Sequence, residues 1–200
     1  MHLLFDIFQG IGIASAVGIR PFLPVLAVGA LASGDVQIDF KGTDFSFLEG
    51  APWLLAMLLC AILLALLERR LGQETTERPP TLLVLVGIAL ALGAIMFGGA
   101  LAQNHHPHWS TDWPGFLAGI ACALVGLAAM RPLFARARAR LDRQAASAVT
   151  MYAETIAVLF AILSVVAPPV GIVGLLALCW MLVAGRRQKD KKYAGLRILR

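Results

Sequence analysis

Apolar residues in this chain are gathered into long blocks and do not alternate with polar ones. The blocks cover residues 7–32, 51–67, 81–102, 114–130 and 151–185. Within each block, apolar side chains would stand on every face of a helix, which is typical of a helix in lipid or inside a bundle. A helix needs about 20 such residues to cross a bilayer. The pattern predicts an all-α fold, a polytopic transmembrane helical bundle that forms a single domain.

Two prolines divide the fifth block. Pro168 and Pro169 stand side by side in its middle, and a helix rarely continues through the residue before a proline. We therefore expect two helices, at 151–167 and 170–185, that turn at the prolines. Together with the three central blocks they make five full spans, and a basic cytoplasmic tail follows at 186–200.

Charges between the blocks predict the orientation, because Lys and Arg are retained on the cytoplasmic side. The segment after the first block is rich in Asp, and the segment 103–113 has no Lys or Arg. Arginines follow the second and fourth blocks, and a cluster of Lys and Arg follows the fifth. We expect the acidic connections outside and the basic ones, with the C-terminus, in the cytoplasm.

The first block is broken by charge and proline. Arg20, Pro21 and Pro24 lie in the middle of 7–32. An arginine at the bilayer centre costs about 2.5–3.5 kcal/mol, so it usually faces the bundle interior or water and has a partner. Prolines leave helix carbonyls unpaired, and transporters build substrate sites from such broken helices. The block is either one long span or a re-entrant hairpin with Arg20 and Pro21 at its tip.

A similar sequence recurs in the second half. Met130, Arg131 and Pro132 repeat the aliphatic-Arg-Pro order of the first block, again after small residues. Internal repeats are usual in transporters. Because Arg131 lies at the predicted inner boundary, the repeat places Arg20 toward the inner side as well and favours the hairpin.

The anionic partner of Arg20 is expected among Asp6, Glu68 and Glu154. Glu154 is the most suggestive, since it stands near the start of an otherwise uncharged helix on the predicted inner side. It either pairs with Arg20 or Arg131, or it is an interfacial carboxylate favoured by the helix dipole. The predicted substrate- or ion-binding set is Arg20, Pro21, Pro24, Glu154, Arg131 and Asp6.

Histidines gather in the segment between the third and fourth blocks. His105, His106 and His108 have ligand chemistry for zinc or copper. Pro107 breaks any helical spacing between them, so a solvated loop is favoured and no metal site is predicted.

The net charge of +5 comes from residues at the ends of apolar blocks, where it sets orientation, so no nucleic-acid partner is expected. Part of the cluster after the fourth block would lie on one helical face beside apolar residues, as in segments that bind anionic lipids. The predicted lipid-contacting residues are Arg136, Arg140 and Arg143.

Two smaller patterns concern packing. Gly10, Ala14 and Gly18 recur every four residues, and such small faces let helix backbones approach, within one chain or between two copies in a homo-oligomer. Apolar residues alternate with polar ones in 36–47, which is consistent with a small β-hairpin or an interfacial flap. The chain has no phosphate-binding loop, catalytic triad or paired metal motif, so we expect neither an enzyme nor a cofactor.

Several stretches resemble a bacterial integral-membrane family known as a domain of unknown function, DUF4126. They are the segment Gly18 to Pro24, Trp53 at the start of the second block, the Glu154 helix with Pro168 after it, and the closing segment Lys192 to Arg197. The resemblance covers most of the chain. It implies a multi-pass protein of the bacterial inner membrane and supplies no activity.

The leading hypothesis is a transporter-like protein that moves a small solute or an anionic amphipathic or lipid substrate through a site at the broken first helix. The alternative is a non-catalytic scaffold or accessory subunit that binds anionic lipid or a partner protein. A polar cavity that reaches Arg20 would favour transport, and Arg20 at the headgroups of a dry bundle would favour the scaffold.

Overall fold

The computed structural model describes residues 2–71, 79–105, 113–138, 140–141 and 143–194. This part of the chain is helical, with no strand. The helices are α1 (His2–Ile19), α2 (Phe22–Ser33), the 3₁₀-helix η1 (Ser46–Glu49), α3 (Ala51–Leu71), α5 (Pro79–His105), α6 (Trp113–Arg138), α7 (Arg143–Val166) and α8 (Pro169–Ala194). The predicted all-α fold is confirmed.

Length and composition make several of these helices suitable for a bilayer. Among the described residues, four helices are long and apolar enough to cross it, at Ala51–Arg70, Pro80–Gln103, Trp113–Ala137 and Ala148–Val166. Three shorter apolar helices cover Leu3–Ile19, Phe22–Ser33 and Pro169–Gly185. The chain is a helical membrane protein.

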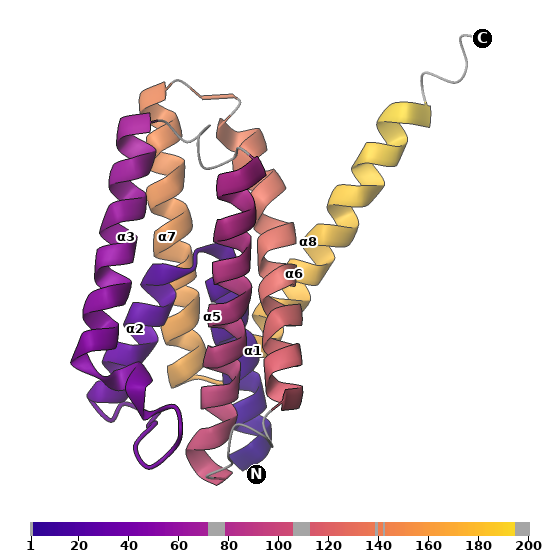
Figure 1. Ribbon diagram of the computed structural model, residues 1–200. Coiled ribbons are helices and arrows are strands. Elements are labelled where there is room, and N and C mark those ends of the chain that lie inside the picture. Colours follow the sequence, from indigo (N-terminus) through magenta and orange to yellow (C-terminus); the bar gives the residue numbers. More distant parts are fainter. Residues whose placement is uncertain (1, 72–78, 106–112, 139, 142, 195–200) are drawn as a thin grey trace.

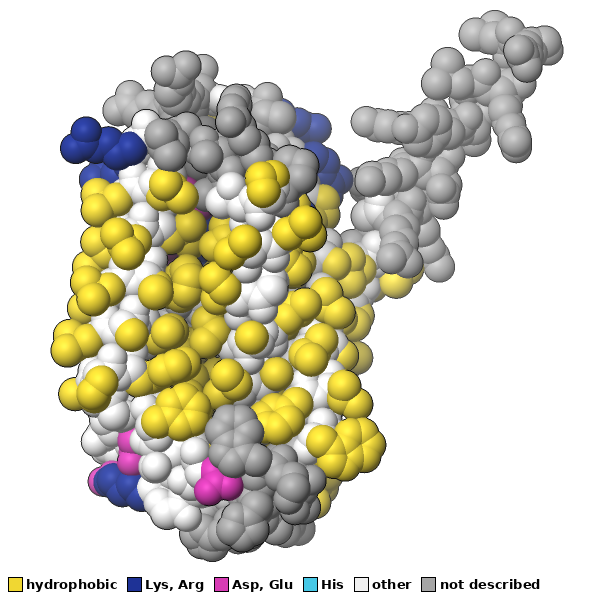
Figure 2. Space-filling model, in the orientation of Figure 1, with side chains coloured by type: hydrophobic (Ala, Val, Ile, Leu, Met, Phe, Trp, Pro, Cys, Tyr) yellow, Lys and Arg dark blue, Asp and Glu magenta, His cyan; other side chains and the backbone are white. Residues whose placement is uncertain are grey.

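The two ends of the bundle differ in charge, and an apolar surface separates them (Figure 2). At the end that we call the basic end, α3 finishes with Arg69 and Arg70. At the opposite, acidic end lies the connection between α2 and α3, which carries Asp35 and Asp39 together with Lys41, the ion-pair partner of Asp35. The predicted orientation rests on this difference in charge.

Helices α1 and α2 form a hairpin in the centre of the bundle. Helix α1 rises from the N-terminus at the acidic end, the chain reverses at Arg20 and Pro21, and α2 returns toward the same end (Figure 1). Pro21 has no amide hydrogen to continue the α1 ladder, and the last amide to bond into α1 is that of Arg20, which donates to the carbonyl of Ala16 at 3.1 Å. Helix α1 packs against α5, α6, α7 and α8.

Glycines allow this central helix to lie against its neighbours at short range. A Cβ added at Gly18 would fall 2.1 Å from the carbonyl oxygen of Ala123 in α6, and one at Gly126 would fall 2.2 Å from that of Ser15. Gly10 of α1 likewise faces the ring of Phe97 in α5. The small face predicted in α1 is thus used for packing within the chain.

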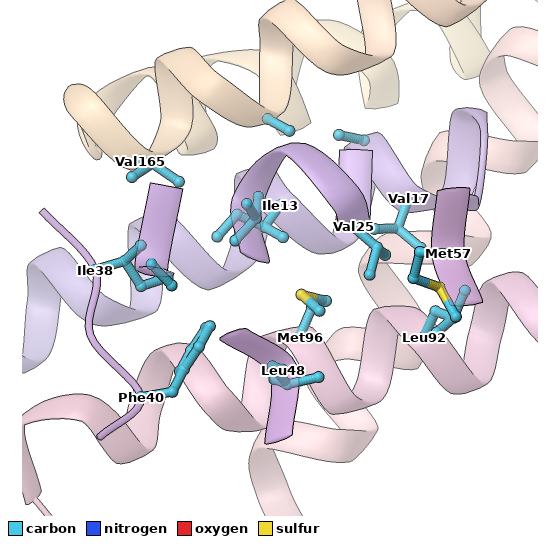
Figure 3. Packing of buried hydrophobic residues seen from close by; sticks show 14 of the residues in the cluster. Ile13, Val17, Val25, Ile38, Phe40, Leu48, Met57, Leu92, Met96 and Val165 are labelled. Atoms are coloured by element: carbon cyan, nitrogen blue, oxygen red, sulfur yellow. The ribbon is translucent and has the colours of Figure 1, made fainter. Parts of the chain in front are cut away.

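The segment between α2 and α3 does not form the β-hairpin suggested by its alternating pattern, and that prediction is wrong. Its backbone makes turns and η1, while Phe40, Phe45 and Leu48 are fully buried. Figure 3 shows Ile38 and Phe40 lying with Ile13 and Met96 in the hydrophobic core. The alternation arises because side chains such as Ile38 and Phe40 are inserted into the helical bundle. An alternating pattern does not distinguish this arrangement from a β-hairpin, because both remove the apolar side chains from water.

Candidate functional site

A cavity of about 120 Å³ lies at the tip of the α1–α2 hairpin. The hairpin contributes Arg20 and Pro21, α3 contributes Glu68, and α6 contributes Arg131. The remaining lining is apolar or glycine and comes from α1, α3, α5 and α6: Gly18, Ile19, Leu64, Leu82, Leu85, Val86, Ala89, Leu127 and Phe134. Three charged side chains therefore meet in an otherwise apolar cavity.

Arg20 is paired with Glu68. Its Nη1 donates to Oε1 of Glu68 at 2.9 Å, and the two side chains are only 15% and 9% exposed. A buried arginine requires a counter-charge and hydrogen-bond acceptors, and Glu68 supplies both. The contact also joins the hairpin tip to the basic end of α3.

The sequence favoured Glu154 for this role, but the contact is made by Glu68. Glu154 lies on α7, is partly buried, and is close enough for its carboxyl group to interact electrostatically with Arg20 and with Glu68. It does not belong to the residues that line the cavity. The arrangement provides Arg20 with one carboxylate in direct contact and a second one nearby.

The two similar Arg-Pro segments meet at this cavity. Arg131 lines it from α6, and Arg20 lines it from the hairpin tip. Their prolines act differently, since the chain reverses at Pro21 while α6 continues past Pro132 to Arg138. A guanidinium group presents several hydrogens in a plane and binds carboxylate or phosphate oxygens in pairs. Two of them in one cavity can hold an anionic group.

Asp6 and Pro24 lie away from the cavity. Pro24 is buried in the first turn of α2, where a proline is tolerated. Asp6, 3% exposed, is at the acidic end of the bundle. There Nε2 of Gln103 donates to Oδ1 of Asp6 at 2.9 Å and to Oε1 of Gln9 at 2.8 Å.

These polar side chains border a second, open cavity of about 620 Å³ at the acidic end. Gln9, 2% exposed, donates from Nε2 to the main-chain oxygens of Gln37 and Val165, at 3.4 and 3.5 Å. Sequence reasoning did not single out Gln9 or Gln103. The available signal was a carboxamide inside an apolar helix, which usually needs a partner within the bundle.

The predicted lipid-contacting arginines fall at the basic end. Arg136 and Arg140 are exposed, and Nε of Arg136 donates to the carbonyl oxygen of Pro132 at 3.0 Å. Arg143 begins α7, but its side chain lies outside the described residues.

The histidine segment gives no structural test of metal binding. His106 and His108 lie outside the described part of the chain, as does the side chain of His105. Within the described part, no group of three or more His, Cys, Asp or Glu side chains could hold a metal ion.

Comparison with known proteins identifies the family. A family model described as a domain of unknown function (DUF4126) matches residues 7–188, so the chain belongs to that family. The resemblance found in its sequence motifs is confirmed. No curated protein and no solved structure matches the chain significantly.

Proposed function

For this member of the DUF4126 family, we propose a transporter-like function in which a small solute or an anionic amphipathic substrate moves through the cavity at the hairpin tip. The proposal places the protein in a bacterial inner membrane, with α8 as a fifth span and the C-terminus in the cytoplasm. The α1–α2 hairpin re-enters the membrane from the acidic, outer side.

The observation that carries the proposal is the content of the tip cavity. Arg20 and Arg131 line it with one carboxylate, Glu68, so the lining has one more positive than negative charge. Such side chains are costly in a membrane and usually mark a substrate or ion pathway. The excess cation and the two guanidinium groups favour an anionic substrate, such as a carboxylate or a phosphate ester.

A second argument comes from the position of the two cavities along α1. Asp6 and Gln9 border the cavity at the acidic end, and Gly18 borders the one at the tip. Between them, Ile13 and Val17 are fully buried in the core. A packed segment between two cavities, each lined by charged side chains, is compatible with a transporter that is closed between its two openings.

The scaffold hypothesis needs no cavity at membrane depth. It is supported by the exposure of Arg136 and Arg140 at the basic end, and it assumes that lipid or a partner protein binds there. Nothing in that hypothesis accounts for Arg131 lining the same cavity as the Arg20–Glu68 pair. We therefore favour transport.

The proposal is tested with purified protein in liposomes and two anionic probes. Radiolabelled glycerol 3-phosphate represents a small solute, and phosphatidylglycerol with a fluorescent acyl chain, quenched from outside by dithionite, represents an amphipathic substrate. We expect protein-dependent movement of at least one probe, its loss in Arg131→Gln, and its retention in Arg70→Gln, which removes an exposed arginine. Equal movement by both variants, or no movement of either probe, would contradict the proposal.

A further inference from the structure

We infer that the tip cavity opens sideways to the bilayer between α3 and α5, and that its occupant is an anionic phospholipid that enters through this opening. The inference rests on the proposed function and specifies the substrate and its route. Three features of the described residues carry it: the position of α3, the composition of the opening, and the charge of the cavity.

Helix α3 is the most peripheral of the four candidate spans. In an apolar 18-residue stretch of α3 only 11% is buried, against 44% in the corresponding stretch of α5. It packs mainly on α2 and η1, toward the acidic end, while its side chains reach α5 in places such as Met57 near Leu92 (Figure 3). At the basic end, the Arg20–Glu68 ion pair joins α3 to the hairpin tip.

The cavity lies between this end of α3 and α5. Leu64 and Glu68 line it from α3, and Leu82, Leu85 and Val86 line it from α5. The three α5 side chains are partly exposed, and Figure 2 shows a recess between the two helices below the basic end. The opening is therefore apolar and faces the region that lipid chains occupy.

This composition suits a molecule with an anionic head and a hydrocarbon chain. Arg20 and Arg131 would bind the phosphate, and the leucines of the opening would contact the acyl chain. The lining side chains carry one net positive charge, although Glu154 lies within electrostatic reach. An anion without an acyl chain would leave the apolar opening unoccupied. It would therefore lack the favourable free energy that a lipid gains when its chain methylenes are buried there.

The ion pair gives the lipid a way to change the structure. Arg20 already donates to Glu68, so a phosphate that binds Arg20 competes with this carboxylate. Loss of the pair removes a direct contact that holds the basic end of α3 to the hairpin. Binding of the lipid head is therefore coupled to separation of α3 from the hairpin tip, which widens the opening.

The test measures binding to the full chain in a non-ionic detergent. The probes are dioctanoyl phosphatidylglycerol, glycerol 3-phosphate as its chainless counterpart, and dioctanoyl phosphatidylcholine as its zwitterionic counterpart. We expect phosphatidylglycerol to bind at least about tenfold more tightly than glycerol 3-phosphate, because burial of only two methylenes is worth about that factor. It should also bind more tightly than phosphatidylcholine, which has the same chains but a head without net negative charge. Arg131→Gln should weaken its binding.

Tryptophan substitutions test the route. Leu85→Trp and Leu82→Trp place bulk in the opening and should weaken phosphatidylglycerol binding by about tenfold or more, with no change for glycerol 3-phosphate. Leu83→Trp adds the same bulk to an exposed position of α5 outside the lining and should have no effect. Thermal unfolding verifies that each variant is folded. Two substitutions in the opening are used so that the test can be made even if only one of the two proteins folds.

The outcomes separate the two proposals. Equal binding of glycerol 3-phosphate and phosphatidylglycerol, both weakened by Arg131→Gln and neither by Leu85→Trp, would overturn the lateral route and leave the anion site in place. Binding of phosphatidylcholine as tight as that of phosphatidylglycerol would overturn the anionic lipid. Absence of binding by every probe would overturn both proposals.

Discussion

Replacement of Glu68 by glutamine isolates the charge of the Arg20–Glu68 pair, because the two side chains have nearly the same shape. The pair is 2.9 Å long and largely buried. Removal of one partner of a buried ion pair costs about 3–5 kcal/mol, since it leaves an uncompensated charge. Glutamine keeps an oxygen that accepts from Arg20, and Glu154 keeps a negative charge nearby. We therefore expect Glu68→Gln to lose about 3 kcal/mol of unfolding free energy, the lower end of that range.

A double-mutant cycle distinguishes a coupled pair from two independent side chains. Arg20→Met and Glu68→Leu each leave the other member of the pair buried without its partner, and each should cost a similar amount. The combination of Arg20→Met with Glu68→Leu replaces the pair by apolar groups, which is often close to neutral. Neutral hydrogen bonds between membrane helices couple by about 0.6 kcal/mol on average and by at most about 1.7 kcal/mol, so a coupling energy above about 2 kcal/mol identifies a charged pair in a poorly solvated site.

The assay is reversible unfolding from non-ionic micelles by added sodium dodecyl sulfate, followed by circular dichroism. Arg70→Gln is the matched control, because Arg70 is exposed near the same end of α3; a change within about 0.5 kcal/mol is expected. Additive losses in the cycle, or a Glu68→Gln protein as stable as the parent, would refute the structural role assigned to the pair.

Three further predictions concern packing, orientation and the acidic end. Gly18→Ala should lower the thermal midpoint, because its Cβ would collide with α6, whereas Gly87→Ala, with no atom within 4 Å, should leave it unchanged or raise it. In a protein whose native cysteines have been replaced, Ser46→Cys should react with a membrane-impermeant maleimide added to intact cells, and Arg70→Cys should react only after permeabilisation. The reverse pattern would contradict the proposed orientation. Gln9→Leu removes buried hydrogen bonds and should cost about 1–3 kcal/mol of unfolding free energy; a neutral result would show that those bonds contribute nothing.

The candidate site was only partly predictable. Arg20 could be selected because a charged residue beside a proline stands out in an apolar block, and Arg131 because it repeats that motif. The structure places both at one cavity. The partner of Arg20 was narrowed to three carboxylates, but the one favoured among them, Glu154, is not the one that contacts it. Glu68 follows Arg20 by 48 residues at the end of another helix, and its position depends on the reversal of the hairpin and on the packing of α3 against α2. No local pattern carries that information.

The sequence by itself determined the all-α membrane fold. Apolar length and composition are local properties that decide whether a helix suits a bilayer. The tertiary structure alone decided what the connection between α2 and α3 does with its alternating residues, where the polar side chains of α1 find partners, and which carboxylate faces Arg20. These outcomes depend on contacts between residues far apart in the chain, such as Gln9 with Gln103, and each is settled by the need to pair every buried polar group while the core stays filled.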